Sequence, residues 1–265
     1  MITSTTNETV KRLSQLKDRR GRLQQGRYLL EGVRLVEEAL ARSPEMVVIA
    51  PDLLKATARG RALEDRLRHD ASSPVLEVTP GVLSRIADTE TPSGVVAVLA
   101  RHPHGLDDVP AARGLVVVLD GVADPGNAGA IVRTAAAAGV DGVVALVGCA
   151  DLYAPKVVRA AMGAHLRLTL VVDCALSALE AWLPARGQTL VASADGDVTL
   201  YDAGVTLAQP TVLVIGGEAY GPTGALDLPG VRPVAIPMPG DMESLNAAAA
   251  AAVILFEAVR QRTRR

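Results

Sequence analysis

From residue 114 onward the chain repeats one pattern, in which a short aliphatic run rich in β-branched residues is followed by a helical segment. We expect strands at 115–119, 142–147, 168–172, 189–193, 211–215 and 234–236. We expect helices at 128–138, 155–162, 175–183 and 245–262. Strands this apolar need both faces covered, which is typical of a mostly parallel sheet with helices on each side. The pattern therefore predicts an α/β fold for the carboxyl-terminal half.

The amino-terminal part shows a shorter version of the same alternation. Expected strands lie at 28–30, 46–50, 75–78 and 95–99, with helices at 33–41 and from about residue 52. The segment that follows, which contains His102, Pro103 and His104, lacks apolar periodicity and is typical of a linker. We expect a small α/β domain at 1–101, a linker at 102–113 and a larger domain at 114–265.

A basic segment opens the chain. Apolar residues at helical spacing between Val10 and Leu23 predict an amphipathic helix. Its cations are Lys11, Arg12, Lys17, Arg19, Arg20 and Arg22. A solvated helix face explains this pattern about as well as contact with phosphate groups does.

Composition excludes several classes of protein. The chain has 27 basic and 29 acidic residues, so it is not a polycation that coats nucleic acid over its whole surface. One Phe, one Trp and four Tyr do not provide a broad platform for stacking bases. Two cysteines without a CxxC spacing suggest neither a disulfide framework nor a zinc site, and we expect no metal. A polar amino terminus and the absence of long apolar runs predict a cytoplasmic protein that does not cross a membrane.

Three loops that follow expected strands carry polar and small residues, and ligands of open parallel sheets collect at such loops. The first, 120–129, contains Asn127 and leads into a helix that carries Arg133. A helix cap at Asn127 and a surface cation at Arg133 form the simpler interpretation. No GxGxxG follows the strand, which argues against a dinucleotide fingerprint.

The second loop begins with Gly216, Gly217 and Glu218 and runs to Pro222. Paired glycines allow a flat ligand to lie on bare backbone, although such pairs are also common in turns. The third loop, 236–246, combines two constrained prolines with a Ser-Leu-Asn entry into an alanine-rich helix. Ser244 or Asn246 is a sufficient cap for that helix, and the spacing alone does not decide between a cap and a binding role.

Taken in order, these loops resemble the three motifs of the SpoU (TrmH-like) family of the SPOUT superfamily, which are RNA ribose 2'-O-methyltransferases that use S-adenosyl-L-methionine (AdoMet). The first motif is similar to Asn127, Gly129 and Arg133. The second is similar to 215–221, and the third to Ile236-Pro237-Met238 with Ser244-Leu245-Asn246. Gly217 stands where many members have Asn, and Pro222 stands where a bulky apolar residue is usual.

The amino-terminal part resembles the substrate-binding domain that precedes the catalytic domain in many members, through Leu30-Glu31-Gly32 and the stretch 91–97. The resemblance implies an L30e-like fold for 1–101 and a trefoil knot in the carboxyl-terminal segment of 114–265. It also implies a homodimer. Composition and periodicity by themselves do not suggest a knot.

The resemblance also implies roles for individual residues. Arg133 would stabilise the developing alkoxide, anchor a phosphate or act as base, and Asn127 and Asn246 would orient it or the ribose. Glu218 and Ser244 would support the loops. The expected cofactor-binding residues are Gly216, Gly217, Ile236, Met238 and Leu245. The basic residues of 10–23 would bind the RNA.

The expected activity is methyl transfer from AdoMet to a ribose 2'-hydroxyl of RNA, with 23S rRNA favoured over tRNA because members with this amino-terminal domain often act on rRNA. A tRNA methyltransferase and a non-enzymatic RNA-binding or ribosome-assembly protein remain alternatives. A nucleotide-dependent oxidoreductase is disfavoured by the missing fingerprint.

Overall fold

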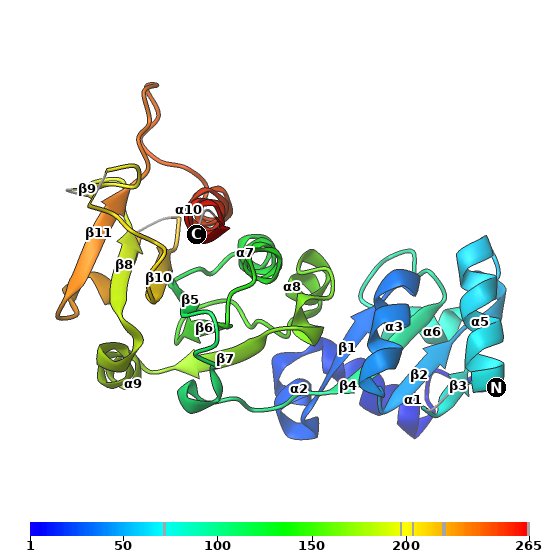
Figure 1. Ribbon diagram of the computed structural model, residues 1–265. Helices are drawn as coiled ribbons and strands as arrows, with labels where there is room; N and C mark the ends of the chain where they lie inside the picture. The colour runs from blue at the N-terminus through cyan, green and yellow to red at the C-terminus, as the bar shows by residue number, and fades with distance from the viewer. Residues whose placement is uncertain (71–72, 197, 203, 219–220, 264–265) are drawn as a thin grey trace. The chain divides into compact units, whose positions relative to one another are not determined.

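The chain forms two compact units in a computed structural model, which describes residues 1–70, 73–196, 198–202, 204–218 and 221–263 (Figure 1). The first unit comprises Met1–His102 together with Tyr153–Leu166, and the second comprises Pro103–Leu152 together with Arg167–Arg265. By its contacts, Tyr153–Leu166 belongs with the first unit. The boundaries expected from the sequence assign this segment to the second.

A four-stranded sheet forms the centre of the first unit. Its order is β1 (Arg27–Glu31), β4 (Val95–Ala100), β2 (Met46–Ile49) and β3 (Val75–Glu77). Strand β4 runs antiparallel to β1 and β2, whereas β2 and β3 are parallel. All four strands lie where the aliphatic runs predicted them.

Helices cover this sheet, and one predicted helix is broken. The helices are α1 (Glu8–Ser14), α2 (Arg19–Gln25), α3 (Val33–Ala39), α4 (Pro51–Leu54), α5 (Ala58–Asp70), α6 (Pro80–Ile86) and α8 (Pro155–Ala160). The single helix expected over 10–23 is wrong, because Asp18 adopts an extended backbone between a 3₁₀ turn and α2. Leu23, placed on the apolar face of that helix, is 49% exposed.

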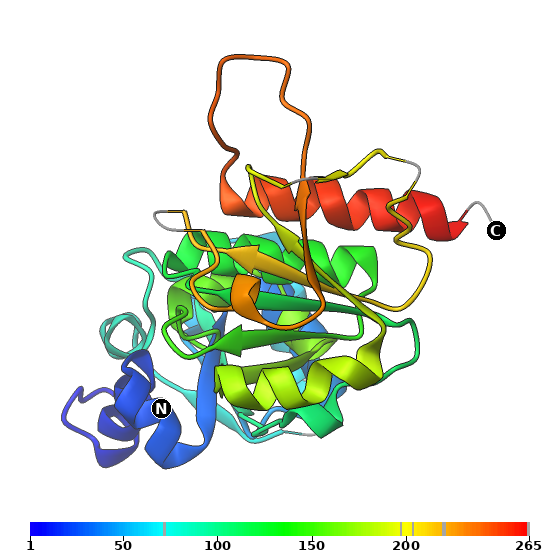
Figure 2. The same ribbon diagram turned by 90° about the vertical axis from the view of Figure 1, so that its left-hand side faces the viewer.

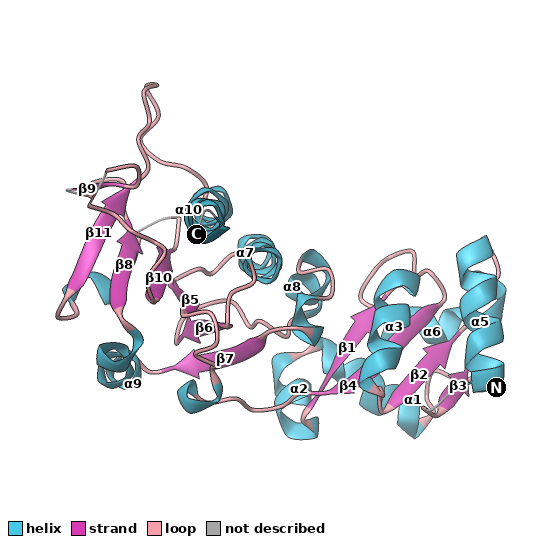
Figure 3. Cartoon of the chain, viewed as in Figure 1, coloured by secondary structure: helices cyan, strands magenta, loops and turns pink. Residues whose placement is uncertain are grey.

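The second unit is built on a seven-stranded sheet, shown as strands in Figure 3. The strand order is β7 (Thr169–Cys174), β6 (Gly142–Leu146), β5 (Leu115–Asp120), β10 (Thr211–Gly216), β8 (Gln188–Ala192), β11 (Val231–Ala235) and β9 (Val198–Thr199). Each pair of neighbours in this order runs parallel. The predicted parallel α/β sheet is confirmed, with β9 as a strand that the sequence analysis missed.

Three helices of the second unit flank the sheet. Helices α7 (Pro125–Ala138) and α10 (Ala247–Thr263) lie side by side in both views (Figures 1 and 2), while α9 (Leu176–Trp182) packs through Leu179 and Trp182 onto alternate residues of the central strands. Small side chains let α7 and α10 approach closely. The buried small residues of these helices are Ala128, Gly129, Ala135, Ala247, Ala251 and Ala258.

Parallel strands bring their carboxyl ends to one edge of the sheet. Asp120 at the end of β5 lies opposite Gly216 at the end of β10, so the first two motif loops leave the sheet side by side. The third loop, 236–246, projects away from the sheet between β11 and α10 (Figure 2). Among the described helices, none combines the length and apolar character that a membrane crossing requires.

Candidate active site

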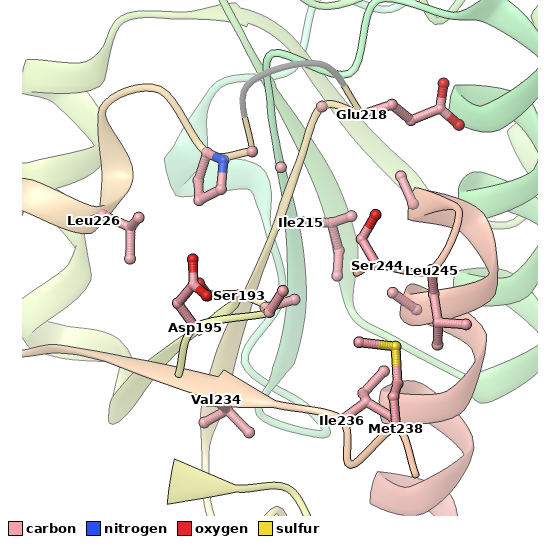
Figure 4. Close-up of a pocket in the computed structure, with 18 residues that line it drawn as sticks. Ser193, Asp195, Ile215, Glu218, Leu226, Val234, Ile236, Met238, Ser244 and Leu245 are labelled. Carbon is pink, nitrogen blue, oxygen red and sulfur yellow. The ribbon is translucent and has the colours of Figure 1, made fainter. Parts of the chain in front are cut away.

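A cavity of about 380 Å³ lies at the edge where β8, β10 and β11 end (Figure 4). Four segments line it: the exit of β8, the glycine loop after β10, the loop after β11, and the start of α10. The lining residues are Ala192, Ser193, Ala194, Asp195, Ile215, Gly216, Gly217, Glu218, Gly221, Pro222, Leu226, Val234, Ile236, Met238, Ser244, Leu245, Ala247 and Ala250. Its volume is within the range of small-molecule sites.

The paired glycines are required by close backbone approaches. A Cβ atom on Gly216 would lie 2.2 Å from the Pro222 nitrogen, and one on Gly217 would lie 2.2 Å from the carbonyl oxygen of Gly121. Both separations are far shorter than a real Cβ contact, so neither position tolerates a side chain in this backbone. The glycine loop therefore folds tightly against the exit of β5 and leaves its own backbone exposed to the cavity.

The polar groups of the cavity favour a cationic organic ligand. The carboxylate of Asp195 lines it together with the hydroxyl groups of Ser193 and Ser244. Glu218 also lines it, but its carboxylate points away from the cavity (Figure 4) and accepts hydrogen bonds from Asn127 and Asn246. No Lys, Arg or His is found among the described lining residues, so the cavity offers no side-chain cation to a nucleotide phosphate. In Figure 4, Asp195 lies across the cavity from Met238.

Three side chains from three distant segments meet beside the cavity. Asn246 donates its Nδ2 to Asn127 Oδ1 at 3.0 Å and to Glu218 Oε1 at 2.6 Å. Asn127 Nδ2 also donates to Glu218 Oε1. This Asn127–Glu218–Asn246 cluster ties α7, the glycine loop and the start of α10 together.

The structure shows which of these residues cap a helix and which bond to other segments. Asp124 is the cap of α7, because its carboxylate accepts the backbone N–H of Asn127 at 2.8 Å. The simpler interpretation of Asn127 as the helix cap is therefore wrong, and its side chain is left for the cluster. Asn246 does both, since its Oδ1 accepts the N–H groups of Ala248 and Ala249 at 3.0 and 3.2 Å.

Arg133 lies on α7, six residues beyond Asn127, which places it about 9 Å further along the helix axis. Its side chain is exposed and makes no hydrogen bond or ion pair with the described residues. Arg133, Asn127 and Asn246 do not line the cavity, whereas Glu218 and Ser244 do. A charged group of this kind is available to a ligand that docks over α7.

All five residues expected to bind the cofactor line one cavity, namely Gly216, Gly217, Ile236, Met238 and Leu245. Ala219 and Tyr220 of the second loop lie outside the described residues. The sequence analysis missed the exit of β8, which brings Ser193 and Asp195 to the cavity, and Leu226 beyond the glycine loop. The signal for Ser193 and Asp195 was a polar Ser-Ala-Asp-Gly turn directly after an apolar strand.

The basic residues of the amino-terminal segment have unequal surroundings. Lys11 is exposed and pairs with Glu8 at 2.7 Å, and Lys17 donates to the carbonyl of Ala87 at 3.1 Å. Arg12, Arg19 and Arg20 are exposed. Arg22 is a correction to the expected RNA-binding set, because its side chain is buried, with the residue 3% exposed, and donates to two backbone carbonyls.

The two cysteines contribute no nucleophile to the site. Cys149 lies in the loop after β6 and donates its thiol to the carbonyl of Leu119 at 3.1 Å. Burial raises the pKa of Cys149 and also that of Cys174, so both thiols stay protonated at neutral pH. Within the described residues no group of three His, Cys, Asp or Glu side chains is arranged to hold a metal ion.

Comparisons with known proteins match both halves of the chain. The SpoU rRNA Methylase family matches residues 114–256, and the MRM3-like substrate binding domain matches residues 7–97. An uncharacterized tRNA/rRNA methyltransferase of Synechocystis is 37% identical, with 98% of this chain and 93% of the relative covered. A 23S rRNA (uridine(2479)-2'-O)-methyltransferase of Streptomyces viridochromogenes is 33% identical over 93% of this chain and 87% of the relative.

A solved structure is similar along nearly the whole chain. The SpoU methyltransferase AviRb from Streptomyces viridochromogenes, crystallised in complex with the cofactor AdoMet, gives a TM-score of 0.85 at 30% identity. The match covers 97% of this chain and 98% of that chain. The similarity therefore extends over both units of the fold.

Proposed function

Because the chain belongs to the SpoU rRNA methylase family, we propose that it transfers a methyl group from AdoMet to a ribose 2'-hydroxyl of RNA, with 23S rRNA as the substrate. The observation that carries this proposal is the cavity at the carboxyl edge of the sheet. It is lined by the second and third motif loops and by the exit of β8. It lies beside the Asn127–Glu218–Asn246 cluster, to which the first motif contributes Asn127.

The cavity fits AdoMet by its chemistry. Exposed backbone at Gly216 and Gly217 and the apolar side chains of Ile236, Met238 and Leu245 suit an adenosine. The carboxylate of Asp195 in the cavity favours the positive charges of the sulfonium and the ammonium groups, and that of Glu218 adds a negative charge beside the cavity. When bound, AdoMet supplies an electrophilic methyl group.

A ribose 2'-hydroxyl is a poor nucleophile, so the protein must orient it and stabilise the negative charge that develops on its oxygen. We assign this stabilisation to Arg133, whose guanidinium is always charged and is exposed on α7. The same side chain can bind the phosphate next to the target ribose. Electrostatic stabilisation needs no loss of the arginine proton, which makes it easier than general-base action.

The Asn127–Glu218–Asn246 cluster would support this chemistry. Its hydrogen bonds hold the start of α7, which carries Arg133, against the glycine loop and the start of α10. A carboxylate that accepts two amide donors stays in one rotamer more readily than a free one. Ser244, which lines the cavity next to Leu245, would support the loop that leads into α10.

RNA capture is assigned to the first unit, through the exposed cations Lys11, Arg12, Arg19 and Arg20 and the half-buried Lys17. Five cations contacting phosphates would give a binding constant that falls steeply with salt concentration. With few aromatic residues in the chain, we favour a folded RNA recognised by shape and phosphate. We place the enzyme in the cytoplasm, where it would meet rRNA.

We also propose that the enzyme is a homodimer. The solvent face of α10 presents Phe256, which is 50% exposed, next to Ala249, Ala252 and Val253 at helical spacing. An apolar stripe on a helix is typical of an interface. The trefoil knot of the carboxyl-terminal segment stays a prediction, supported by the family to which the chain belongs.

The role of Arg133 is tested by Arg133→Ala. We expect the rate of methyl transfer in a single turnover to fall by roughly 10²–10³, as for loss of one donor to a developing oxyanion. AdoMet affinity, measured by calorimetry, should stay within about threefold of the wild-type value because Arg133 does not line the cavity.

The matched control is Arg232→Ala, which removes an exposed arginine of β11 that does not line the cavity. It should leave both quantities unchanged. An Arg133→Ala protein that binds AdoMet and methylates RNA at the wild-type rate would eliminate the assigned role.

A further inference from the structure

Asp120, the last residue of β5, holds the glycine loop through its side chain. It is 3% exposed, and its Oδ1 accepts the hydroxyl of Thr223 at 2.8 Å. Its Oδ2 accepts the backbone N–H groups of Gly224 and Ala225, both at 3.0 Å. A buried carboxylate is costly unless its oxygens are satisfied, and here three donors from one loop satisfy it.

The same residue holds the other end of that loop through its backbone. The Asp120 carbonyl accepts the N–H of Gly217 at 3.0 Å. Both ends of the segment from Gly217 to Ala225 are therefore bonded to a single residue. Gly217, Glu218, Gly221 and Pro222 of this segment line the cavity.

The chain contains a second buried aspartate of the same kind at the opposite edge of the sheet. Asp141 precedes β6, and its carboxylate accepts the N–H of Arg113 at 2.9 and 3.0 Å and that of Leu115 at 3.2 Å. It holds the beginning of β5, whereas Asp120 holds the loop that lines the cavity. Asp141 does not line the cavity. A substitution at Asp141 therefore shows what the loss of a buried aspartate does to stability alone, without an effect on the cavity.

We propose that Asp120 is a positioning residue for the cofactor, which acts by fixing the two described ends of the glycine loop and through them the backbone of Gly217 and Glu218. The proposal rests on the proposed AdoMet-dependent activity. Asp120 does not itself line the cavity, so it acts through the loop. Its loss should weaken AdoMet binding and leave RNA binding, assigned to the first unit, unchanged.

The chemistry of the three bonds predicts how variants differ. Asp120→Ala removes all three acceptor contacts, and Thr223→Val removes one. Asp120→Asn can retain all three, because its amide oxygen can accept both N–H groups while its amide nitrogen donates to the Thr223 hydroxyl. A positioning role through hydrogen bonds is therefore rescued by Asn, whereas a role that needs the negative charge is not.

The test measures KM for AdoMet, KM for RNA and the unfolding midpoint for wild type, Asp120→Ala, Asp120→Asn, Thr223→Val and Asp141→Ala. We expect Asp120→Ala to raise KM for AdoMet about tenfold or more, in line with loss of bonds to a buried charged acceptor, with KM for RNA unchanged. Thr223→Val should raise KM for AdoMet less, and Asp120→Asn should stay near wild type. Asp141→Ala should lower the midpoint without changing KM for AdoMet.

The proposal is overturned if KM for AdoMet of folded Asp120→Ala equals that of wild type, or if Asp141→Ala raises it equally. If Asp120→Ala does not fold, an unchanged KM for AdoMet in Thr223→Val overturns the proposal and a raised one supports it. An inactive wild-type protein would instead contradict the proposed function. In that case calorimetry with AdoMet on the same variants still tests the positioning role.

Discussion

Three buried charged side chains, those of Arg22, Asp120 and Asp141, bind backbone groups. The carboxylates of Asp120 and Asp141 accept backbone N–H groups, and the Arg22 guanidinium donates to the carbonyls of Leu16 and Lys17 at 2.8 and 2.6 Å. Each of these side chains holds the backbone at a point where a helix or strand begins or ends. At Arg22 that place is the 3₁₀ turn between α1 and α2, where two carbonyls lack helical partners.

Arg20 and Arg22 lie two residues apart on α2 and are expected to respond differently to substitution. Arg22→Ala should lower the free energy of unfolding by about 1–3 kcal/mol, because it leaves buried carbonyls without a donor. Arg20→Ala should leave stability unchanged, weaken RNA binding and reduce the slope of log affinity against log salt concentration by about one. Denaturant unfolding and filter binding over a salt series measure the two quantities.

Each variant serves as the control for the other. If Arg22→Ala were fully stable and lost RNA affinity instead, the buried arrangement of its guanidinium would be contradicted. If Arg20→Ala bound RNA with the wild-type salt slope, the assignment of α2 to phosphate contact would fail.

At the scale of elements, the aliphatic runs were enough to place nearly all the strands. Of the eleven strands in the described part of the chain, ten overlap predicted runs, because a buried parallel strand requires a continuous apolar segment, although β11 begins three residues before its predicted run. The two-residue β9 is too short to carry such a pattern. Helix α6 (Pro80–Ile86) was also missed, because its seven residues mix apolar and polar types without a clear pattern.

The broken helix at 10–23 shows where periodicity misleads. Its spacing satisfies a single helix, yet Asp18 is extended and the chain reverses so that Gly21 packs on Gln15. A Cβ on Gly21 would lie 2.0 Å from the Gln15 carbonyl oxygen. The spacing of apolar residues does not predict tertiary packing of this kind.

The site was only partly predictable for a related reason. Residues next to a strand end, such as Gly216 and Ile236, follow from the strand pattern and the resemblance together. Asp120 was placed only at the start of the first loop, because its bonds to Thr223, Gly224 and Ala225 join positions about a hundred residues apart. Such pairings depend on the strand order β5-β10-β8, which the sequence analysis did not predict.

Helix α10 makes a prediction of its own about assembly. Its buried side packs on the fold through Ala251, Ile254 and Leu255, whereas its other side exposes Phe256, the one phenylalanine of the chain. We expect wild type to have about twice the 27.5 kDa chain mass in light scattering, and Phe256→Gln to shift towards monomer. Phe256→Leu, which keeps an apolar side chain, should stay dimeric.

Two observations would contradict this assignment of the interface. The first is a wild-type protein that has the mass of a single chain at all concentrations tested. The second is a Phe256→Gln variant that remains as dimeric as wild type.

For the whole molecule, we propose that the two units divide the work of the reaction. The first unit carries the basic segment α1–α2, and the second carries the cavity, Arg133 and the Asn127–Glu218–Asn246 cluster. A net charge of −2 is compatible with an RNA partner because the cations of α1 and α2 are concentrated in a short segment. Affinity for RNA and affinity for AdoMet should thus change independently in variants of the two units.

The most direct test of ribose methylation uses labelled AdoMet with 23S rRNA and the purified full chain, followed by alkaline hydrolysis of the RNA. A methyl group on a 2'-oxygen removes the hydroxyl that attacks the neighbouring phosphodiester. The label should therefore be recovered in an alkali-resistant dinucleotide, with Arg133→Ala giving little of it. Recovery of the label in mononucleotides, or no transfer to 23S rRNA while tRNA accepts the methyl group, would contradict the proposed reaction or its proposed substrate, respectively.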